Sequence, residues 1–281
     1  MLASQDIITP HITDSHHLEL PCFKPGFACE VELPQWTPIH LGPVTLDLSP
    51  TKHVVMLLIA ATLCLVTLLL AARAHKRQHE KSGQSRGFAN GVEALVLYIR
   101  QEVILPNVGH HGEGYAPFLL TLFFFILFAN LLGLIPYGST ATGNIAVTGT
   151  LAILTLITVE IAGMRALGPV GYMKTIVYWP SDQPVVMKSL LTIIMTPIEF
   201  IGKLTKPFAL AIRLFANMNA GHIVVLALIG LIFTFAGIAS AAPLLMAVAI
   251  MMLEIFVAFL QAFIFALLAS VFIGQIREAA H

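Results

Sequence analysis

The segment LAIRLFANMNAGH, residues 210–222, places polar side chains inside an apolar stretch long enough to cross a membrane. Arg213 carries a guanidinium that stays protonated, and His222 carries an imidazole that titrates near neutral pH. An ionisable side chain inside a membrane costs about 2.5 to 3.5 kcal/mol on insertion scales, so its presence indicates a function. A fixed positive charge can block an ion path, whereas an imidazole beside a carboxylate can pass protons. These residue types favour a proton path with an electrostatic gate.

The polar residues of this region follow the period of an α-helix. At about 100° per residue, four later residues lie within about 40° of Glu199 on one helical face: Lys203, Lys206, Arg213 and Asn217. His222 lies about 140° from Glu199 by the same measure, so it faces a different neighbour. The two lysines lie nearer to one membrane surface, and for them an interfacial location is an equal alternative.

The next apolar segment carries Glu254 and Gln261, seven residues apart and therefore on one helical face. If the two helices are antiparallel, His222 meets Glu254 near one membrane surface, and Arg213 meets Gln261 near the middle. The chain offers Arg213 no obvious carboxylate at a matching depth, which points to a partner on another subunit. Two structural alternatives stay open for Arg213, which could snorkel to the interface or pair with Glu199.

The composition places the chain in the membrane class. Of its 281 residues, 57% are hydrophobic and 11% are charged, whereas soluble domains carry about 25% charged residues. Lys plus Arg equals Asp plus Glu, at 15 each, so the net charge points to no nucleic-acid partner. We expect an all-α integral membrane protein in contact with lipid.

Apolar runs predict five membrane-spanning helices, since a hydrocarbon core of about 30 Å needs roughly 20 apolar residues. The expected spans are residues 54–72, 117–135, 144–163, 187–232 and 243–274. The last two exceed one perpendicular span, so we expect them to be steeply tilted, and Pro197 and Pro207 offer places to bend. Residues 1–50 are expected to form an extramembrane arm, and residues 51–281 the membrane domain.

Basic residues set the expected orientation. Residues 73–86 hold Arg73, Lys76, Arg77, Lys81 and Arg86, and an excess of Lys and Arg marks the cytoplasmic side. The N-terminus is then outside and the C-terminus is cytoplasmic, as in a multi-pass protein of a bacterial inner (plasma) membrane. The arm lacks the features of a signal peptide, and outside the cell it would permit either a Cys22–Cys29 disulfide or two thiols.

The chain shows no signature of catalysis or of a bound cofactor. A glycine-rich phosphate loop and a G-x-S-x-G nucleophile motif are absent from the sequence. Five histidines could bind a metal, but no Cys/His spacing matches a structural zinc site: His11, His16, His17, His110 and His111. We expect no metal, no cofactor and no enzymatic activity of the isolated chain.

Three stretches resemble subunit a of the rotary F-type ATP synthase. They are PIEFIGKLTKPFALAIRLFANMNAGH (197–222), EIFVAFLQAFIFALLASVFIG (254–274) and FANLLGLIP (128–136). RLFANMNAGH together with LQAF is the most specific part. The five-helix layout extends the resemblance over most of the chain, with the exception of the arm.

The resemblance implies roles for the residues of the polar face. Arg213 matches the family's essential arginine, which faces the ion-carrying carboxylate of each c subunit. Asn217 and Gln261 match polar residues beside that arginine. Glu199 matches a carboxylate that the family places on the cytoplasmic side of the path.

His222 and Glu254 match the pair that lines the family's outer half-channel, with His and Glu exchanged relative to some members. The implied mechanism has two offset half-channels, and protons would pass this pair to reach a c-ring carboxylate. After rotation, that carboxylate meets Arg213 and releases its proton toward Glu199. The implied partners are the c-ring and the peripheral-stalk b subunits.

Two other functions fit part of the pattern. A sodium-driven version of the same subunit is the closest alternative, since the c subunit largely selects the ion. A proton-coupled secondary transporter would also bury His, Glu and Arg, but it usually has two similar halves, and no such repeat is visible.

Overall fold

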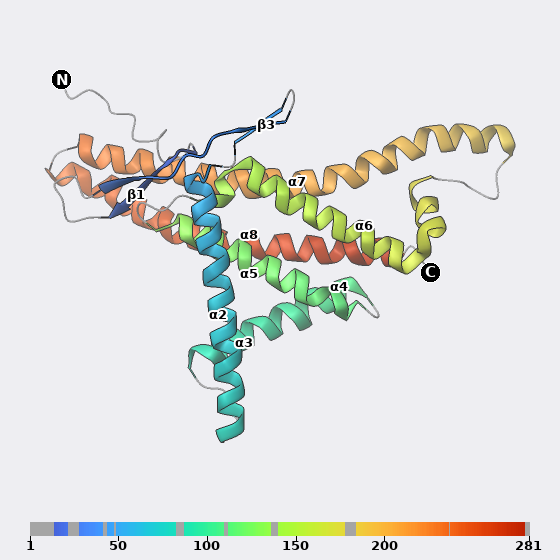
Figure 1. Cartoon of the computed structure of the whole chain (residues 1–281), viewed down its shortest axis with the longest axis horizontal. Helices are drawn as coiled ribbons and strands as arrows, with labels where there is room; N and C mark the ends of the chain where they lie inside the picture. The colour runs from blue at the N-terminus through green and yellow to red at the C-terminus, as the bar shows by residue number, and fades with distance from the viewer. Residues whose placement is uncertain are drawn as a thin grey trace. The chain divides into compact units, whose positions relative to one another are not determined.

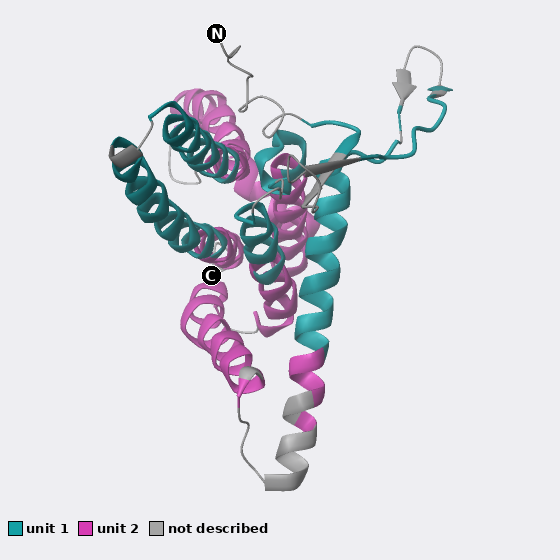
Figure 2. Cartoon of the chain, turned by 90° about the vertical axis from the view of Figure 1, so that its left-hand side faces the viewer, with its two compact units in different colours: residues 1–69, 124–147, 214–262 teal, residues 70–123, 148–213, 263–281 magenta. Residues whose placement is uncertain are grey.

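The computed structural model describes most of the chain. The described residues are 14–21, 28–41, 44–47, 49–82, 87–109, 112–135, 140–177, 184–235 and 237–278. The chain divides into two compact units, each built from three segments, as the colours of Figure 2 show. Unit 1 comprises Met1–Leu69, Phe124–Val147 and Leu214–Ala262, and unit 2 comprises Leu70–Phe123, Thr148–Arg213 and Phe263–His281.

The part of the chain that the structure describes contains five helices long and apolar enough to cross a membrane. They are α2 (Lys52–Ser82), α5 (Ala116–Gly133), α6 (Ile145–Ile176), α7 (Val185–Thr234) and α8 (Ala241–Glu278). The prediction of an all-α membrane protein with five spans is confirmed.

Two helices extend beyond the apolar runs that predicted them. α2 continues through residues 73–82, because Arg, Lys, Gln and Glu are good helix formers although they are too polar for a membrane. α6 continues to Ile176 through a bend at Gly168, where φ is 69° and Pro169 follows. Glycine adopts this positive φ without strain, so the chain turns there and then resumes a helix. Apolar runs therefore indicate which residues can lie in the hydrocarbon core, but they do not indicate where a helix ends.

α7 and α8 are longer than a membrane is thick. Their 50 and 38 residues span about 75 and 57 Å at a rise of about 1.5 Å per residue. The hydrocarbon core is only about 30 Å thick. Within unit 1, α2 also runs at a steep angle to the antiparallel hairpin of α7 and α8 (Figure 1), so these helices do not share one direction across the membrane. Both observations support the expected steep tilt.

Residues 88–108 form a helical segment that the sequence did not predict. It comprises α3 (Phe88–Tyr98), the π-helix η1 (Ile99–Ile104) and α4 (Leu105–Val108). Ile99, Ile104 and Val108 are buried, whereas Gln101 and Glu102 are exposed. An amphipathic segment of this kind lacks the uninterrupted apolar run by which the five spans were predicted.

The described part of the arm forms two antiparallel hairpins. β1 (His17–Pro21) pairs with β2 (Ala28–Glu32), and β3 (Ile39–Leu41) pairs with β4 (Val44–Leu46). The backbone N–H of Lys52 donates to the carbonyl of Ser15 at 2.9 Å, which joins the arm to the start of α2. Cys22 lies outside the described residues, as do His11, His110 and His111, so the expectations about them are untested.

Candidate functional site

His222 of α7 and Glu254 of α8 meet within unit 1, as the sequence predicted. Nδ1 of His222 lies 4.0 Å from Oε1 of Glu254, and the two side chains are 16% and 13% exposed. They come together because they lie at similar distances from the turn between the two helices, which contains the 3-10 helix η4 (Gly237–Ser240). The pair therefore combines an imidazole and a carboxylate away from bulk water.

The other ring nitrogen of His222 is held by two oxygen atoms. Nε2 lies 2.9 Å from the carbonyl oxygen of Gly133 and 2.8 Å from Oγ1 of Thr140. A carbonyl only accepts hydrogen bonds, so this geometry assigns the proton to Nε2. Nδ1, which faces Glu254, is then the nitrogen that has a lone pair and can accept a proton. We refer to Gly133, Thr140, His222 and Glu254 as the His222 cluster.

Two glycines make the close approaches in this cluster possible. A Cβ atom at Gly221 would clash with the carboxylate of Glu254, and a Cβ atom at Gly133 would clash with the side chain of Thr140. The sequence prediction missed both glycines and Thr140. AGH and LLGLIP contained the glycines, but a glycine in an apolar helix does not by itself reveal what approaches it.

Amide side chains extend the polar region of unit 1. Nδ2 of Asn217 donates to Oε1 of Gln261 at 3.0 Å, and Gln261 is buried. The fully buried Asn130 donates to the carbonyl of Ala258 at 3.3 Å and accepts from Oγ1 of Thr142 at 2.7 Å. The resemblance implied that Asn217 and Gln261 each lie beside Arg213, but it did not imply their contact with each other, and Asn130 was not singled out.

Arg213 lies on α7 one turn before Asn217, with an exposed side chain. Among the described residues of its own unit, the guanidinium has no hydrogen bond or ion pair. Phe208 and Ile212 beside it are also exposed, at 66% and 41%. The expected contact between Arg213 and Gln261 stays a prediction, since the two residues belong to different units.

A cavity of about 200 Å³ lies within unit 2, and we name it the Lys203 cavity. Glu199, Lys203 and Lys206 of α7 all line it, which confirms that this part of the predicted polar stripe forms one face. At the cavity, this polar face of α7 lies opposite residues of α6 and α8. The other polar residues of its wall are Thr155, Glu160, Thr175 and Gln275.

The two lysines of the cavity donate to neutral oxygen atoms. Nζ of Lys203 lies 3.0 Å from Oγ1 of Thr175 and 4.7 Å from the centre of the Tyr172 ring. Nζ of Lys206 lies 3.1 Å from Oε1 of Gln275 and 5.2 Å from the centre of the Phe272 ring. The lysines are thus held at the cavity wall by contacts to other helices, which an interfacial anchor would not need.

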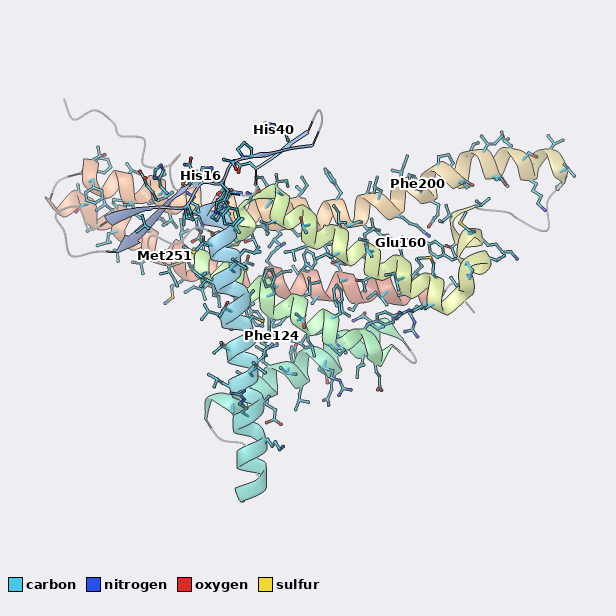
Figure 3. All side chains as sticks on the ribbon, viewed as in Figure 1. His16, His40, Phe124, Glu160, Phe200 and Met251 are labelled. Atoms are coloured by element: carbon cyan, nitrogen blue, oxygen red, sulfur yellow. The ribbon has the colours of Figure 1, made fainter. Side chains whose placement is uncertain are left out.

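Glu160 is the main residue of this cavity that the sequence prediction did not assign. It lies on α6 (Figure 3), near the end of the predicted span 144–163, and lines the same cavity as Glu199. A carboxylate inside a membrane span is itself a signal of function. That signal was present in the sequence, but the sequence analysis did not single out Glu160.

Known proteins resemble the chain over nearly its whole length. A family model described as ATP synthase A chain matches residues 54–274. The chain is 47% identical to ATP synthase subunit a of Chloroherpeton thalassium, over 94% of this chain and 74% of that one. It is 46% identical to ATP synthase subunit a of Myxococcus xanthus, over 95% of this chain and 92% of that one. A protein of Chlorobium luteolum named ATP synthase subunit a 2 is 45% identical, over 98% of this chain and 79% of that one. The chain belongs to the ATP synthase A chain family, and it is a membrane-sector subunit.

Proposed function

We propose that the chain is the proton-translocating stator subunit of an F-type ATP synthase and has no catalytic activity of its own. The observation that carries this proposal is Arg213, a permanent charge exposed among apolar side chains on a membrane-spanning helix. A guanidinium in that position needs a counter-charge, and one on a moving partner would give it a gating role. In this proposal the counter-charge is the carboxylate of a c subunit.

The exposure of α7 supports a large partner on this helix. Within an 18-residue apolar stretch of α7 only 6% of the residues are buried, whereas 56% are buried in the corresponding stretch that contains α5. Apolar residues around Arg213 are suited to contact with both lipid and other membrane helices. We assign this surface to the c-ring, and we expect the peripheral-stalk b subunits to bind elsewhere on the chain.

The two polar regions supply the two half-channels of this proposal. Protons arrive from outside through the His222 cluster, where the imidazole and the carboxylate pass them toward the c-ring. After rotation the c-ring carboxylate meets Arg213, and its proton leaves to the cytoplasm through the Lys203 cavity. Glu199 and Glu160 accept it there. Each proton that crosses contributes about 2.3 kcal/mol per 100 mV.

The basic residues of 73–86 support this orientation, with the N-terminus outside and the C-terminus in the cytoplasm of a bacterial cell. The Lys203 cavity is then the cytoplasmic half-channel. Most of its α7 residues belong to the half of the helix that leads to the cytoplasmic end in this topology, whereas His222 belongs to the half that leads to the outer end.

ATP-driven proton pumping in inverted membrane vesicles tests the proposal. Arg213→Ala should abolish pumping, while the passive proton leak of vesicles stripped of the catalytic head stays the same or rises. Arg165→Ala, which removes an exposed arginine of α6, should pump as the parent does. Pumping that survives Arg213→Ala would overturn the proposal. Pumping that requires added sodium would replace the proton with Na⁺.

A further inference from the structure

The turn between α5 and α6 carries the hydroxyl group that contacts His222. It contains the 3-10 helix η3 (Ala141–Gly143), which Thr140 precedes, and Thr140 is only 5% exposed. Oγ1 of Thr140 and the carbonyl oxygen of Gly133 lie against the same ring nitrogen, Nε2 of His222. With the proton on Nε2, both oxygen atoms accept from it, and the lone pair of Nδ1 is left toward Glu254. The position of this turn therefore decides whether Thr140 helps to hold the ring.

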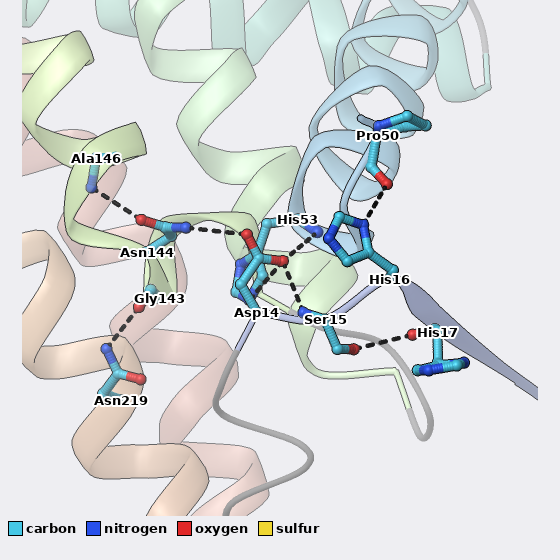
Figure 4. A network of polar contacts seen from close by, with 10 residues as sticks. All are labelled: Asp14, Ser15, His16, His17, Pro50, His53, Gly143, Asn144, Ala146 and Asn219. Atoms are coloured by element: carbon cyan, nitrogen blue, oxygen red, sulfur yellow. Dashed lines mark hydrogen bonds and ion pairs between the residues drawn. The ribbon is translucent and has the colours of Figure 1, made fainter. Parts of the chain in front are cut away.

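Asn219 of α7 binds this turn from the side of His222 (Figure 4). Nδ2 of Asn219 donates to the carbonyl oxygen of Gly143 at 2.9 Å and to that of Phe215 in its own helix at 3.1 Å. Both N–H groups of the amide are thus used, one within α7 and one across to the turn. Asn219 lies three residues before His222, so the two side chains project from neighbouring positions of one helical face toward the same turn.

Two further contacts hold the turn, and they differ in length. Oγ1 of Thr142 donates to Oδ1 of Asn130 on α5 at 2.7 Å, and both side chains are fully buried. On the side of the arm, Nδ2 of Asn144 donates to Oδ2 of Asp14 at 3.5 Å (Figure 4), which is long for a hydrogen bond. The turn is thus fixed mainly by α5 and α7, and α7 is the helix that carries the imidazole.

The two ends of the turn are joined to each other. The backbone N–H of Gly143 donates to the carbonyl oxygen of Thr140 at 2.9 Å, the spacing of a 3-10 turn. A shift of Gly143 therefore moves the backbone of Thr140, and Oγ1 moves with it. The side chain of Thr140 has little room to compensate, because buried groups are closely packed.

We propose that Asn219 is a positioning residue of the outer half-channel, which holds the turn so that Thr140 keeps its contact with Nε2 of His222. This inference rests on the proposed function. The amide of Asn219 does not titrate, and it acts through Thr140 on the orientation of the imidazole. The lone pair of Nδ1 then stays toward Oε1 of Glu254, which is 4.0 Å away.

ATP-driven proton pumping of Asn219→Ser tests the inference. A serine in a helix donates to the carbonyl four residues earlier, here that of Phe215, but its side chain is one atom shorter and loses the contact with Gly143. Pumping should slow roughly threefold, the effect of one lost hydrogen bond, and Asn219→Leu, which loses both contacts, should be about as slow. Asn107→Leu is the matched control and should pump as the parent does, because its amide donates to the carbonyl of Val103 in its own helical segment. The amount of assembled complex is measured in every membrane.

Double variants separate positioning from a general loss of stability. In a Thr140→Val background the contact with Nε2 is already lost, so Asn219→Ser should slow pumping no further. In a Thr140→Ser background the hydroxyl is present, and the roughly threefold cost should return.

Three results would overturn the inference. They are parent-like pumping of Asn219→Ser, an equal cost of this change with and without the hydroxyl at residue 140, and a failure of both Asn219 variants to assemble, which would make Asn219 a residue of the fold. If Arg213→Ala still abolishes pumping in any of these cases, the proposed function stands without the inference.

Discussion

The His222 cluster and the Lys203 cavity use the same helix, α7, to build opposite kinds of polar environment. In the His222 cluster, Nε2 of His222 is held by two oxygen atoms at 2.8 and 2.9 Å. The Lys203 cavity instead leaves about 200 Å³ between four charged side chains. The first site fixes each atom by direct contact, and the second holds charges around a space.

Side-chain size explains the difference. Gly133 and Gly221 remove the atoms that would keep neighbouring groups apart in the His222 cluster. In the cavity, by contrast, the long side chains of Lys203 and Lys206 reach Thr175 and Gln275 at the wall of a space lined by three helices. A water molecule occupies about 30 Å³ in the liquid, so the cavity has room for several.

The two sites should therefore respond differently to substitution. A proton passed between fixed groups depends on each distance, because transfer requires hydrogen-bond contact. A proton passed through several waters can take more than one route. We expect large effects of single changes in the His222 cluster and small ones in the Lys203 cavity.

Gly221→Val should have the largest effect. The added side chain occupies the place of the Glu254 carboxylate and separates it from His222. Loss of a positioned proton-transfer group predicts that ATP-driven pumping falls roughly 100-fold. Gly230→Val is the matched control on the same helix, since a Cβ atom there meets no described residue within 4 Å. Equal losses in both variants would show that the glycines matter for the helix and not for the contact.

Thr140→Val should have a smaller effect on the same site. Valine keeps the shape of the side chain but removes the oxygen 2.8 Å from Nε2 of His222, while the Gly133 carbonyl still holds the ring. The loss of one hydrogen bond, about 1 kcal/mol, predicts roughly fivefold slower pumping. Thr121→Val serves as the control, because its hydroxyl donates to the carbonyl of Pro117 in its own helix. A Thr140→Val variant that pumps at the parent rate would remove Thr140 from the path.

The sequence could predict the members of a site that share a helix or face each other across a hairpin. His222 and Glu254 were expected to meet because their positions follow from helical period and antiparallel packing. Thr140 was not, because it lies between α5 and α6, and the path of a connection depends on the tertiary structure.

The ends of the helices show a similar limit to what the sequence can predict about the fold. Gly168, with a φ of 69°, interrupts the regular helix of α6, but a further helical stretch follows to Ile176, beyond the expected end at residue 163. Whether a glycine followed by proline ends or bends a helix depends on what packs against the next turn. Tyr172 in that turn is buried, which favours continuation. Packing of this kind cannot be read from one sequence.

Glu160→Gln and Glu199→Gln test the tolerance of the Lys203 cavity. Each single change should slow pumping only about twofold to threefold, the effect of roughly 0.5 kcal/mol, since the other carboxylate still accepts protons. The double change should cost clearly more than the product of the two. Pumping is measured in inverted vesicles with matched amounts of complex. A single change as severe as Gly221→Val would contradict the idea that this cavity offers alternative routes.

Thr175→Val should have the smallest effect of the set. It removes the oxygen that Nζ of Lys203 contacts at 3.0 Å, but Lys203 keeps the Tyr172 ring at 4.7 Å. That cation–π contact is worth about 0.5 to 1 kcal/mol, so the ammonium stays at the wall and pumping should change by less than about twofold. Tyr172→Leu added to Thr175→Val also removes the contact of Lys203 with the Tyr172 ring, and only this double variant should slow pumping further. If Thr175→Val alone matched Thr140→Val, a single hydrogen bond would matter equally in both sites, and the contrast between fixed and open paths would fail.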